Sequence, residues 1–400
     1  MSRRVRLRLL VVADVSPIER RGGAVRLIRE QCRRLKERGH DCLILCRDPW
    51  YEAPGETEVD GVPVQHFQVS RAHAFSFFLT SIREARRAGA RLLAQASWDA
   101  VIFHQPLSAY GVGARAIRSR IPCAYFFHSP AGVEYQLRHR SDQLAWSVNV
   151  APLLLRWVER RALKRATQII VLSDFSRHEL HKNHGEVRPP IIKIPGGVDC
   201  QRFCPAADRV GVRERLGLPT DGLLLLTVRD LEHRMGIDNL IRAMAEVLKE
   251  VPATLVIGGR GELQAPLTKL ARHLRIDPSV RFAGFIHEND LASYYQAADL
   301  FVLPTRALEG FGLVTAEALA CGTPVLGTPV GATPEILLPL DPDLITRDAS
   351  PGAIADGIIG FARRANPGLR ERCRAYAETH FNWERVVDAL EATLGQMVRR

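Results

Sequence analysis

Four hundred residues exceed the length of one ordinary domain and predict two or three domains, each able to bury its own core. Apolar residues make up 46% and charged residues 25% of the chain, which is typical of a globular protein and excludes a disordered or collagen-like one. No apolar run approaches the roughly 18 residues of a membrane span. The eight cysteines form no Cys-x-x-Cys pair, which favours reduced thiols over a zinc site or a disulfide framework.

The formal net charge of +11 is distributed unevenly. Residues 1–200 contain 32 Lys/Arg and 19 Asp/Glu, a net charge of +13, whereas residues 201–400 contain 23 and 25, a net charge of −2. This asymmetry indicates an anionic partner for the first half, which could be a membrane surface, a nucleic acid or a phosphorylated substrate. An arginine-rich proteome would explain the excess equally well.

The chain begins with basic residues and the short apolar run Leu7–Ala13, a combination that also occurs in signal peptides. Asp14 ends the run and no small-residue cleavage site follows, so we predict a buried strand. A helix is predicted over Gly23–Arg38, because its apolar residues recur on one face and Gly39 ends the pattern.

Apolar runs continue to alternate with helical patterns along the rest of the chain. The further strand candidates are Asp41–Cys46, Ala100–Phe103, Cys123–Phe127, Gln168–Leu172, Ile191–Ile194, Leu223–Val228, Thr254–Ile257, Val280–Ala283, Leu300–Leu303 and Pro324–Gly327. Near-continuous apolar strands separated by helices indicate parallel sheets covered on both faces. The sequence therefore predicts two doubly wound α/β domains, joined by the breaker-rich segment 194–205.

A glycine-containing loop after one of these strands is the strongest candidate site. Gly310 and Gly312 would let backbone amides approach a ligand, and a helix starting at about Leu313 would add partial positive charge suited to phosphate. Glu309 in the loop and Glu317 inside the helix could hold hydroxyls at different points of one ligand. The alternative is a capping glutamate and a solvated one, but a carboxylate among apolar residues is costly without partners.

In this setting, Glu309-x7-Glu317 resembles the signature of the retaining glycosyltransferases of family 4, which have the GT-B fold. Weaker motifs in the same order extend the resemblance over nearly the whole chain: Gly22-Gly23-Ala24, Asp60–Val64, Ser173–Ser176, Gly197–Asp199 and Gly331–Glu335. The resemblance implies two Rossmann-like domains that face an interdomain cleft. Residues 1–200 would bind the acceptor and be completed by a C-terminal helix at 382–400, and residues 201–381 would bind a nucleotide-sugar donor.

The resemblance also implies roles for residues of the second domain. Glu317 would hydrogen-bond the ribose of the donor nucleotide. Glu309 would hold hydroxyls of the donor sugar, and the rest of the donor site would be Gly310, Phe311, Gly312 and Leu313.

Arg229 follows the predicted strand Leu223–Val228, and the resemblance implies that it binds the donor diphosphate. A guanidinium at the carboxyl end of a strand matches phosphate geometry. The alternative is a surface ion pair with Asp230 or Glu232.

One position departs from the family pattern. The family usually has a lysine before the glycine of the segment His233–Gly236, as a second phosphate ligand, and here Met235 stands at that position. Methionine cannot bind phosphate, so we expect Arg234 to supply the charge.

Three residues of the first domain are further candidates. Gly23 opens the first helix, where backbone amides could face the diphosphate. His128 follows the predicted strand Cys123–Phe127, and the resemblance places it beside the reacting sugar; without the resemblance, a structural histidine would be the better interpretation. Glu134 is a candidate acceptor contact.

The implied reaction moves a sugar from a UDP- or GDP-sugar to an acceptor hydroxyl with retention of anomeric configuration. Attack would come from the front face, and the departing phosphate would take the acceptor proton. Arg229, the loop amides and a helix N-terminus would neutralise the leaving diphosphate, so neither a metal nor another cofactor is expected. Asp341-Pro342-Asp343 has the form of an Asp-x-Asp metal motif, but its prolines favour a turn.

The acceptor would be a glycan or a lipid-linked molecule, in the synthesis of a glycan, a cell-envelope polysaccharide or a glycolipid. One alternative is a nucleotide-sugar 2-epimerase of GT-B fold, which the Glu309-x7-Glu317 segment disfavours. Another is a catalytically degenerate glycosyltransferase-like binding protein, given Met235. No nucleic-acid partner is expected, because no nucleic-acid module is recognisable.

One predicted helix carries four arginines on one face and apolar residues on the neighbouring face: Arg83, Arg86, Arg87 and Arg91, with Phe75, Phe78, Leu79 and Ile82. It is either a membrane-surface helix or an amphipathic core helix with a solvated basic face. We expect a cytoplasmic protein, with peripheral attachment at the inner membrane face if the first alternative holds.

Overall fold

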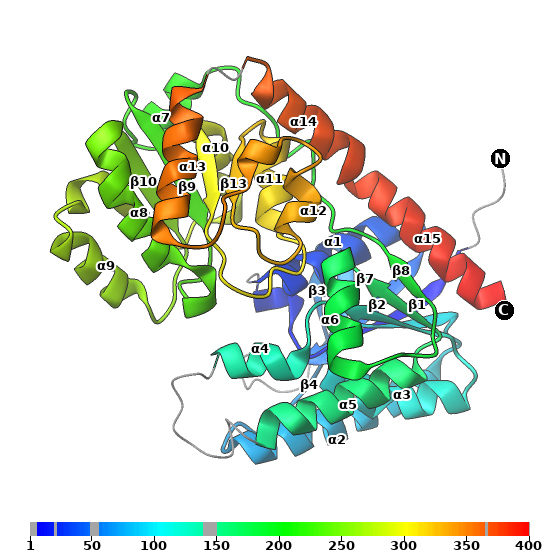
Figure 1. The fold of residues 1–400 in the computed structure, drawn as a ribbon. Coiled ribbons are helices and arrows are strands. Elements are labelled where there is room, and N and C mark those ends of the chain that lie inside the picture. Colours follow the sequence, from blue (N-terminus) through cyan, green and yellow to red (C-terminus); the bar gives the residue numbers. More distant parts are fainter. Residues whose placement is uncertain (1–5, 20–21, 49–55, 139–149, 365–366, 400) are drawn as a thin grey trace. The chain divides into compact units, whose positions relative to one another are not determined.

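The computed structural model describes residues 6–19, 22–48, 56–138, 150–364 and 367–399 (Figure 1). The chain divides into two compact units, residues 1–195 with 386–400 and residues 196–385. The second unit therefore begins at Gly196, where the sequence analysis expected residue 201.

The first unit is built on an eight-stranded sheet with the strand order β3-β4-β2-β1-β5-β6-β7-β8. Its strands are β1 (Arg8–Ala13), β2 (Asp41–Arg47), β3 (Glu56–Val59), β4 (Val62–Phe67), β5 (Ala100–Phe103), β6 (Cys123–Phe127), β7 (Gln168–Val171) and β8 (Ile191–Lys193). Its helices are α1 (Gly23–Glu37), α2 (Ala74–Gln95), α3 (Pro106–Arg118), α4 (Ala131–Arg138), α5 (Ala151–Arg165) and α6 (Asp174–His184). The apolar run at residues 9–13 is buried in the centre of this sheet, which confirms the predicted first strand.

The edge hairpin β3–β4 was not predicted, and it is the one antiparallel pair in a sheet that is otherwise parallel. Asp60 and Gly61 form its turn with φ of 52° and 78°, values that suit the tight turn of a two-residue hairpin. β3 is short and mostly polar, so it lacks the apolar run on which the strand prediction relied.

The second unit contains a five-stranded parallel sheet with the order β11-β10-β9-β12-β13. Its strands are β9 (Leu223–Val228), β10 (Ala253–Gly258), β11 (Val280–Gly284), β12 (Leu300–Leu303) and β13 (Val325–Gly327). Its helices are α7 (Arg209–Arg215), α8 (Ile237–Glu250), α9 (Gln264–His273), α10 (Glu288–Ala297), α11 (Leu313–Ala320), α12 (Thr333–Leu337), α13 (Pro351–Arg363) and α14 (Leu369–His380). Each expected strand of this half is present within two residues of its predicted bounds.

The last helix, α15 (Trp383–Arg399), contributes to both units. Trp383 packs on Gly197 so closely that a Cβ at Gly197 would lie 2.3 Å from the indole. Beyond residue 385, the helix buries Leu390 and Leu394 in the first unit. Glu391 also accepts hydrogen bonds there from the Arg38 guanidinium at 2.7 Å and pairs with the His40 ring at 2.8 Å.

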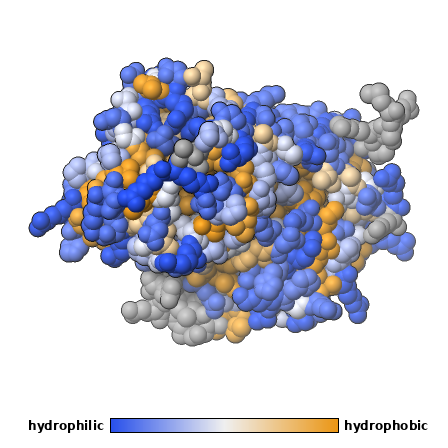
Figure 2. All heavy atoms as spheres, turned by 45° about the horizontal axis from the view of Figure 1, so that its top comes forward, coloured by the Kyte–Doolittle hydropathy of each residue, from blue (hydrophilic) through white to orange (hydrophobic). Residues whose placement is uncertain are grey.

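The surface drawn in Figure 2 is mostly hydrophilic, with hydrophobic residues between the polar ones. All eight cysteines lie in described parts of the chain, and all are free thiols. Burial raises the pKa of Cys42 and of Cys46 to about 12, so these thiols stay protonated and unreactive at neutral pH. Within the described ranges, no helix combines the length and the apolar character needed to cross a bilayer.

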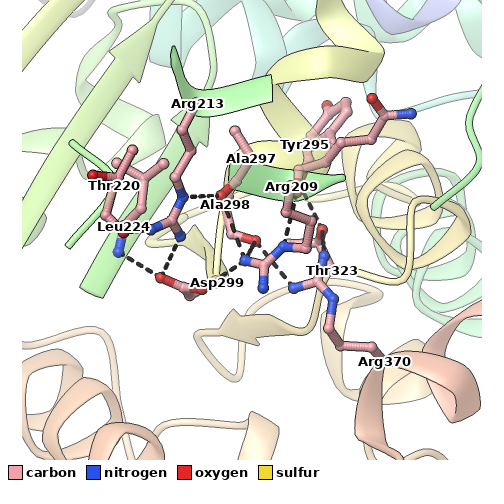
Figure 3. Close-up of polar contacts among 11 residues, drawn as sticks. Arg209, Arg213, Thr220, Leu224, Tyr295, Ala297, Ala298, Asp299, Thr323 and Arg370 are labelled. Carbon is pink, nitrogen blue, oxygen red and sulfur yellow. Dashed lines mark hydrogen bonds and ion pairs between the residues drawn. The ribbon is translucent and has the colours of Figure 1, made fainter. Parts of the chain in front are cut away.

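A partly buried polar network closes the amino-terminal edge of the second sheet (Figure 3). Asp299, directly before β12, accepts hydrogen bonds from Arg209 at 2.6 Å, from Arg213 at 2.7 Å and from the backbone N–H of Leu224 at 2.8 Å. Burial alone would raise the pKa of Asp299, but these donors outweigh it and hold the pKa below its usual value. The same two guanidiniums donate to carbonyl groups at the end of α10, so the network ties α7 to α10 and to β9.

Asp299→Ala should destabilise the second unit by about 3 kcal/mol, because it leaves two guanidiniums of a partly buried network without their carboxylate. The measurement is hydrogen exchange of the β9 and β12 amides in the full chain, which reports on this unit separately from the first. Glu250→Ala, which breaks an exposed ion pair with Arg363, is the control and should change exchange little. Equal effects of the two substitutions would contradict a structural role for the network.

Candidate functional site

The carboxyl ends of β9 and β12, which are neighbours in the second sheet, bring Arg229 and Glu309 together. Arg229 directly follows β9, and Glu309 lies in the loop 304–312 after β12. The Arg229 Nη2 donates to Glu309 Oε2 at 2.6 Å, and the Thr305 hydroxyl donates to the same oxygen at 3.1 Å. Arg229 is 9% and Glu309 7% exposed, so each charge is buried and depends on the other for compensation.

Met235 covers the other side of this ion pair. Its sulfur lies 3.3 Å from Nε and 2.9 Å from Nη2 of Arg229. The partner of Arg229 is therefore Glu309, and within the described residues it pairs with neither Asp230 nor Glu232, so the surface-pair alternative is wrong. Its Nη1 and the Oε1 of Glu309 make no hydrogen bond to any part of the chain that the structure describes.

Arg234 is held by protein groups in this structure. Its Nε lies 3.3 Å from Glu232 Oε2, and its Nη1 donates to the Leu308 carbonyl at 3.3 Å. Leu308 has a φ of 53°, a left-handed conformation that is strained for a leucine. Arg234 thus fixes the strained residue that directly precedes Glu309.

Glycines bring the neighbouring loops close to Glu309. Gly312 caps the N-terminus of α11 with a φ of 79°, and a Cβ there would lie 3.5 Å from Glu309 Oε1. Gly331 packs against the Glu309 backbone, where a Cβ would lie 2.3 Å from the carbonyl oxygen. The N–H of Ala332 donates to that oxygen at 2.8 Å. The segment 331–335, a motif of the sequence analysis, therefore helps to position Glu309.

The loop continues through Gly310 and the buried Phe311 into Leu313, the first residue of α11. Phe311 and Leu313 both pack on Gly196, where a Cβ would lie 2.6 and 2.7 Å from their side chains. The five residues from 309 to 313, all expected at the donor site, therefore lie in one tightly packed turn at the N-terminus of α11.

Glu317 is 2% exposed and lies in α11. Its Oε2 accepts a hydrogen bond at 3.0 Å from the hydroxyl of Tyr295, a fully buried residue of α10. Tyr295 was not predicted, because a tyrosine within an ordinary helical pattern carries no signal of its role. The two glutamates therefore differ in their hydrogen-bond partners: Glu309 bonds to the guanidinium of Arg229 and Glu317 to the phenol hydroxyl of Tyr295.

In the first unit, His128 follows β6 and lies against His104, which follows the neighbouring strand β5. His104 Nδ1 and His128 Nε2 are 3.2 Å apart, and the two rings stack with a centroid distance of 5.4 Å. Burial lowers the pKa of His128 to about 4, although the charge of Glu134 acts in the opposite direction. Burial, and to a smaller extent the neighbouring His128, lowers the pKa of His104 well below its usual value. Both rings are therefore neutral at pH 7, and one of them donates its N–H to the other. The equivalent position of the two histidines after adjacent strands was a signal that could have revealed His104.

Asp14, which follows β1, is a further buried carboxylate at the same edge of the first sheet. It accepts hydrogen bonds from the backbone N–H groups of Leu107 at 3.0 Å and Ser108 at 2.8 Å, and so caps α3. Burial raises its pKa, while Arg47, the last residue of β2, and these N–H groups act in the opposite direction. From the sequence, Asp14 was identified only as the end of a strand.

The remaining first-unit candidates are more exposed. Gly23 is the exposed first residue of α1, after Gly22 with a φ of 86°. Glu134 lies in the first turn of α4, accepts a hydrogen bond from the Ser129 hydroxyl at 2.5 Å and pairs with Arg138 at 3.0 Å.

Among the residues that the structure describes, no group of three or more His, Cys, Asp or Glu side chains is arranged to hold a metal ion. Asp341 instead caps the short 3-10 turn Pro342–Leu344 and pairs with Arg364 at 3.1 Å, which confirms the predicted turn.

Two family models cover most of the chain. The model described as Glycosyltransferase Family 4 matches residues 21–202, and the one described as Glycosyl transferases group 1 matches residues 209–380. The chain is 31% identical to a D-inositol 3-phosphate glycosyltransferase 1 of Catenulispora acidiphila over 386 residues, which is 93% of this chain and 90% of that protein.

A second relative is a GDP-mannose-dependent monoacylated alpha-(1-6)-phosphatidylinositol monomannoside mannosyltransferase of Corynebacterium glutamicum. It is 31% identical over 241 residues, which is 56% of this chain and 62% of that protein. Among solved structures, a sucrose-phosphate synthase from Thermosynechococcus elongatus superposes with a TM-score of 0.81 at 23% identity, over 98% of this chain and 99% of that one.

The structural likeness shows the GT-B fold, and the sequence matches extend across both units. The pairing of Glu309 with Arg229 also falls within the segment that the group 1 model matches. The chain belongs to glycosyltransferase family 4, the group 1 glycosyl transferases, and is a transferase of GT-B fold.

Proposed function

We propose that the protein moves a sugar from a UDP- or GDP-sugar to an acceptor hydroxyl with retention of anomeric configuration. The observation that carries this proposal is the buried pair of Arg229 and Glu309 beside the N-terminus of α11. Each partner keeps one polar atom, Nη1 and Oε1, that makes no hydrogen bond within the described residues. A diphosphate oxygen suits the first atom and a sugar hydroxyl suits the second.

Charge develops on the diphosphate as the bond to the sugar lengthens. In the proposal, Arg229 Nη1, the backbone amides after Glu309 and the N-terminus of α11 stabilise that charge, which removes the need for a metal ion. Arg234 adds a second guanidinium in place of the lysine that the family usually has next to Gly236.

Glu309 is a poor candidate for a nucleophile, because its pairing with Arg229 and Thr305 already occupies one carboxylate oxygen. The proposed reaction is therefore a front-face attack in which the leaving phosphate accepts the acceptor proton. His128 is neutral, and so contributes a hydrogen bond to the sugar rather than a charge.

The names of both relatives refer to inositol compounds: one is an inositol phosphate and the other a phosphatidylinositol glycolipid. We propose a phosphate-bearing acceptor for this chain, free or lipid-linked, bound by the first unit with Glu134 among its contacts. The positive first half supports this class. So does Arg47, whose pKa is lowered first by burial and also by the nearby Arg71, while Asp14 acts in the opposite direction.

We place the protein in the cytoplasm, attached peripherally to the inner membrane face, where a lipid-linked acceptor is reached directly. Two alternatives predict different behaviour. A 2-epimerase would convert a nucleotide sugar without any acceptor, and a degenerate binding protein would bind the nucleotide without turnover.

The decisive experiment is calorimetric titration of the full chain with UDP, GDP and ADP in EDTA. We expect one nucleotide to bind selectively, and Glu317→Ala to weaken it by roughly 10- to 100-fold through loss of hydrogen bonds to a charged group. No binding of any nucleotide would contradict the donor site, and binding that requires added Mg²⁺ or Mn²⁺ would contradict metal independence.

The same titration tests the phosphate contact assigned to Arg234. Arg234→Ala should weaken nucleotide binding, whereas Arg242→Ala, at an exposed position of α8, should leave it unchanged. Unchanged affinity of Arg234→Ala would refute the assignment.

Glu309→Ala should reduce kcat by about 10²-fold or more, because it removes a sugar contact and leaves the buried Arg229 unpaired. Glu317→Ala should act mainly on the KM for the donor. The readout is nucleoside diphosphate release with inositol 3-phosphate as the test acceptor, and Glu246→Ala, at an exposed position, is the control. Equal kcat losses in the two glutamate variants would disprove the division of roles.

The pH dependence of turnover tests the state of His128. Burial holds its pKa at about 4, below the usual value, so the neutral form persists until the pH falls to that value. We expect kcat/KM to show no inflection near pH 6.5 and to decline only as the pH approaches 4. An inflection near 6.5 that disappears in His128→Asn would show that the ring titrates normally and would contradict the proposed neutral role.

A further inference from the structure

Four of the six large apolar side chains that are exposed in the described part of the first unit lie on two helices. Phe75 and Leu79 are 51% and 48% exposed on α2, and Leu153 and Trp157 are 65% and 46% exposed on α5. Each pair is four residues apart, so each forms a stripe along its helix. We call the surface that carries both stripes the α2/α5 face. A contiguous exposed apolar patch of this kind commonly marks an interaction surface.

An apolar groove of about 360 Å³ lies on this face. α2 contributes Phe78, Leu79 and Ile82 to it, α3 contributes Tyr110, and α5 contributes Leu154 and Trp157. Leu79 and Trp157 belong both to the stripes and to the groove wall, so the exposed stripes open directly into the groove. The groove is large enough for a segment of hydrocarbon chain.

The same two helices are strongly basic. Their sequences contain nine Lys/Arg and two Asp/Glu. One of the acids, Glu159, is 2% exposed and bonds to His184 and the Ala131 amide, so it does not offset charge at the surface. The other, Glu84, pairs with two arginines of its own helix.

Basic groups also lie next to the groove itself. Arg83 and Arg86 form part of its lining, and the Arg161 guanidinium stands 5.1 Å from the centroid of the Trp157 ring. Exposed guanidiniums therefore surround an apolar opening that contains a half-exposed tryptophan. This arrangement matches a membrane interface, where aromatic and aliphatic side chains enter the acyl boundary and cations meet lipid phosphates.

We infer that the α2/α5 face docks on an anionic phospholipid bilayer and that its groove takes up part of an acyl chain. This inference rests on the membrane attachment included in the proposed function, and it assigns that attachment to named helices. The charge complementarity extends along both helices, α2 alone having 22 residues, which fits an extended charged surface better than a single small ligand.

The test is co-sedimentation of the full chain with vesicles of phosphatidylcholine alone or mixed with phosphatidylglycerol. We expect a clear preference for the anionic vesicles that weakens as salt is added. The double variant Leu153→Ser/Trp157→Ser should lower partitioning about tenfold or more, since two exposed apolar side chains would no longer enter the bilayer.

Matched variants on the second unit control for general effects. Val210→Ser/Leu338→Ser removes two side chains that are similarly exposed, at 54% and 46%, and should leave partitioning unchanged. For charge, Arg160→Glu/Arg161→Glu should abolish the anionic preference, whereas Arg242→Glu/Arg347→Glu, with the same change in net charge, should largely retain it.

Groove occupancy has its own readout. Brominated acyl chains should quench the part of the tryptophan emission that is lost in Trp157→Phe.

Nucleotide titration of every variant shows whether the donor site is intact, so failure of docking and failure of the proposed transfer are distinguishable. Docking is disproved if anionic vesicles are not preferred or if the control variants lose as much binding as the face variants. Absence of quenching disproves occupancy of the groove.

Discussion

The second unit depends on the compensation of one buried positive charge. Arg229 lies at the end of β9 with almost no access to solvent, and an isolated guanidinium there would carry a large desolvation penalty. Glu309 provides the compensation, and the structure positions Glu309 through several separate contacts. Arg234 donates to the carbonyl of the preceding residue, Leu308. The N–H of Ala332 donates to the backbone carbonyl of Glu309, and the Thr305 hydroxyl donates to the Glu309 carboxylate. Loops that are distant in sequence therefore converge on one ion pair.

The buried ion pair of Arg229 and Glu309 explains why an uncharged side chain fits at position 235. A lysine there would place a second cation beside Arg229 with one carboxylate between them, whereas the thioether contributes volume without charge. The pair of Arg229 and Glu309 is consequently close to neutral before any ligand binds. Positive charge for a diphosphate has to come from the remaining guanidinium donors and from backbone dipoles.

Much of the fold could be predicted because parallel strands buried on both faces leave uninterrupted apolar runs, such as 9–13 and 300–303. The β3–β4 hairpin could not, since a short polar edge strand lacks that pattern. For the site, Glu309 and Arg229 were identified by motif and by position after a strand, but their direct pairing was not, because spacing along the chain does not show which loops meet. His104, Asp14 and Tyr295 were missed for a related reason: each acts on another side chain or on a helix end and carries no motif of its own.

The way α15 is shared between the units affects how the molecule can be divided. Its first residues pack on Gly197 in the second unit. Its later residues fill the core of the first unit and bond to Arg38 and His40. The first unit is therefore encoded by two stretches separated by the whole of the second. A fragment that ends at residue 195 would expose the apolar surface that Leu390 and Leu394 cover. The two units are therefore unequal as independent folding modules: the second is continuous in sequence, and the first is complete only when residues 386–399 have also been synthesised.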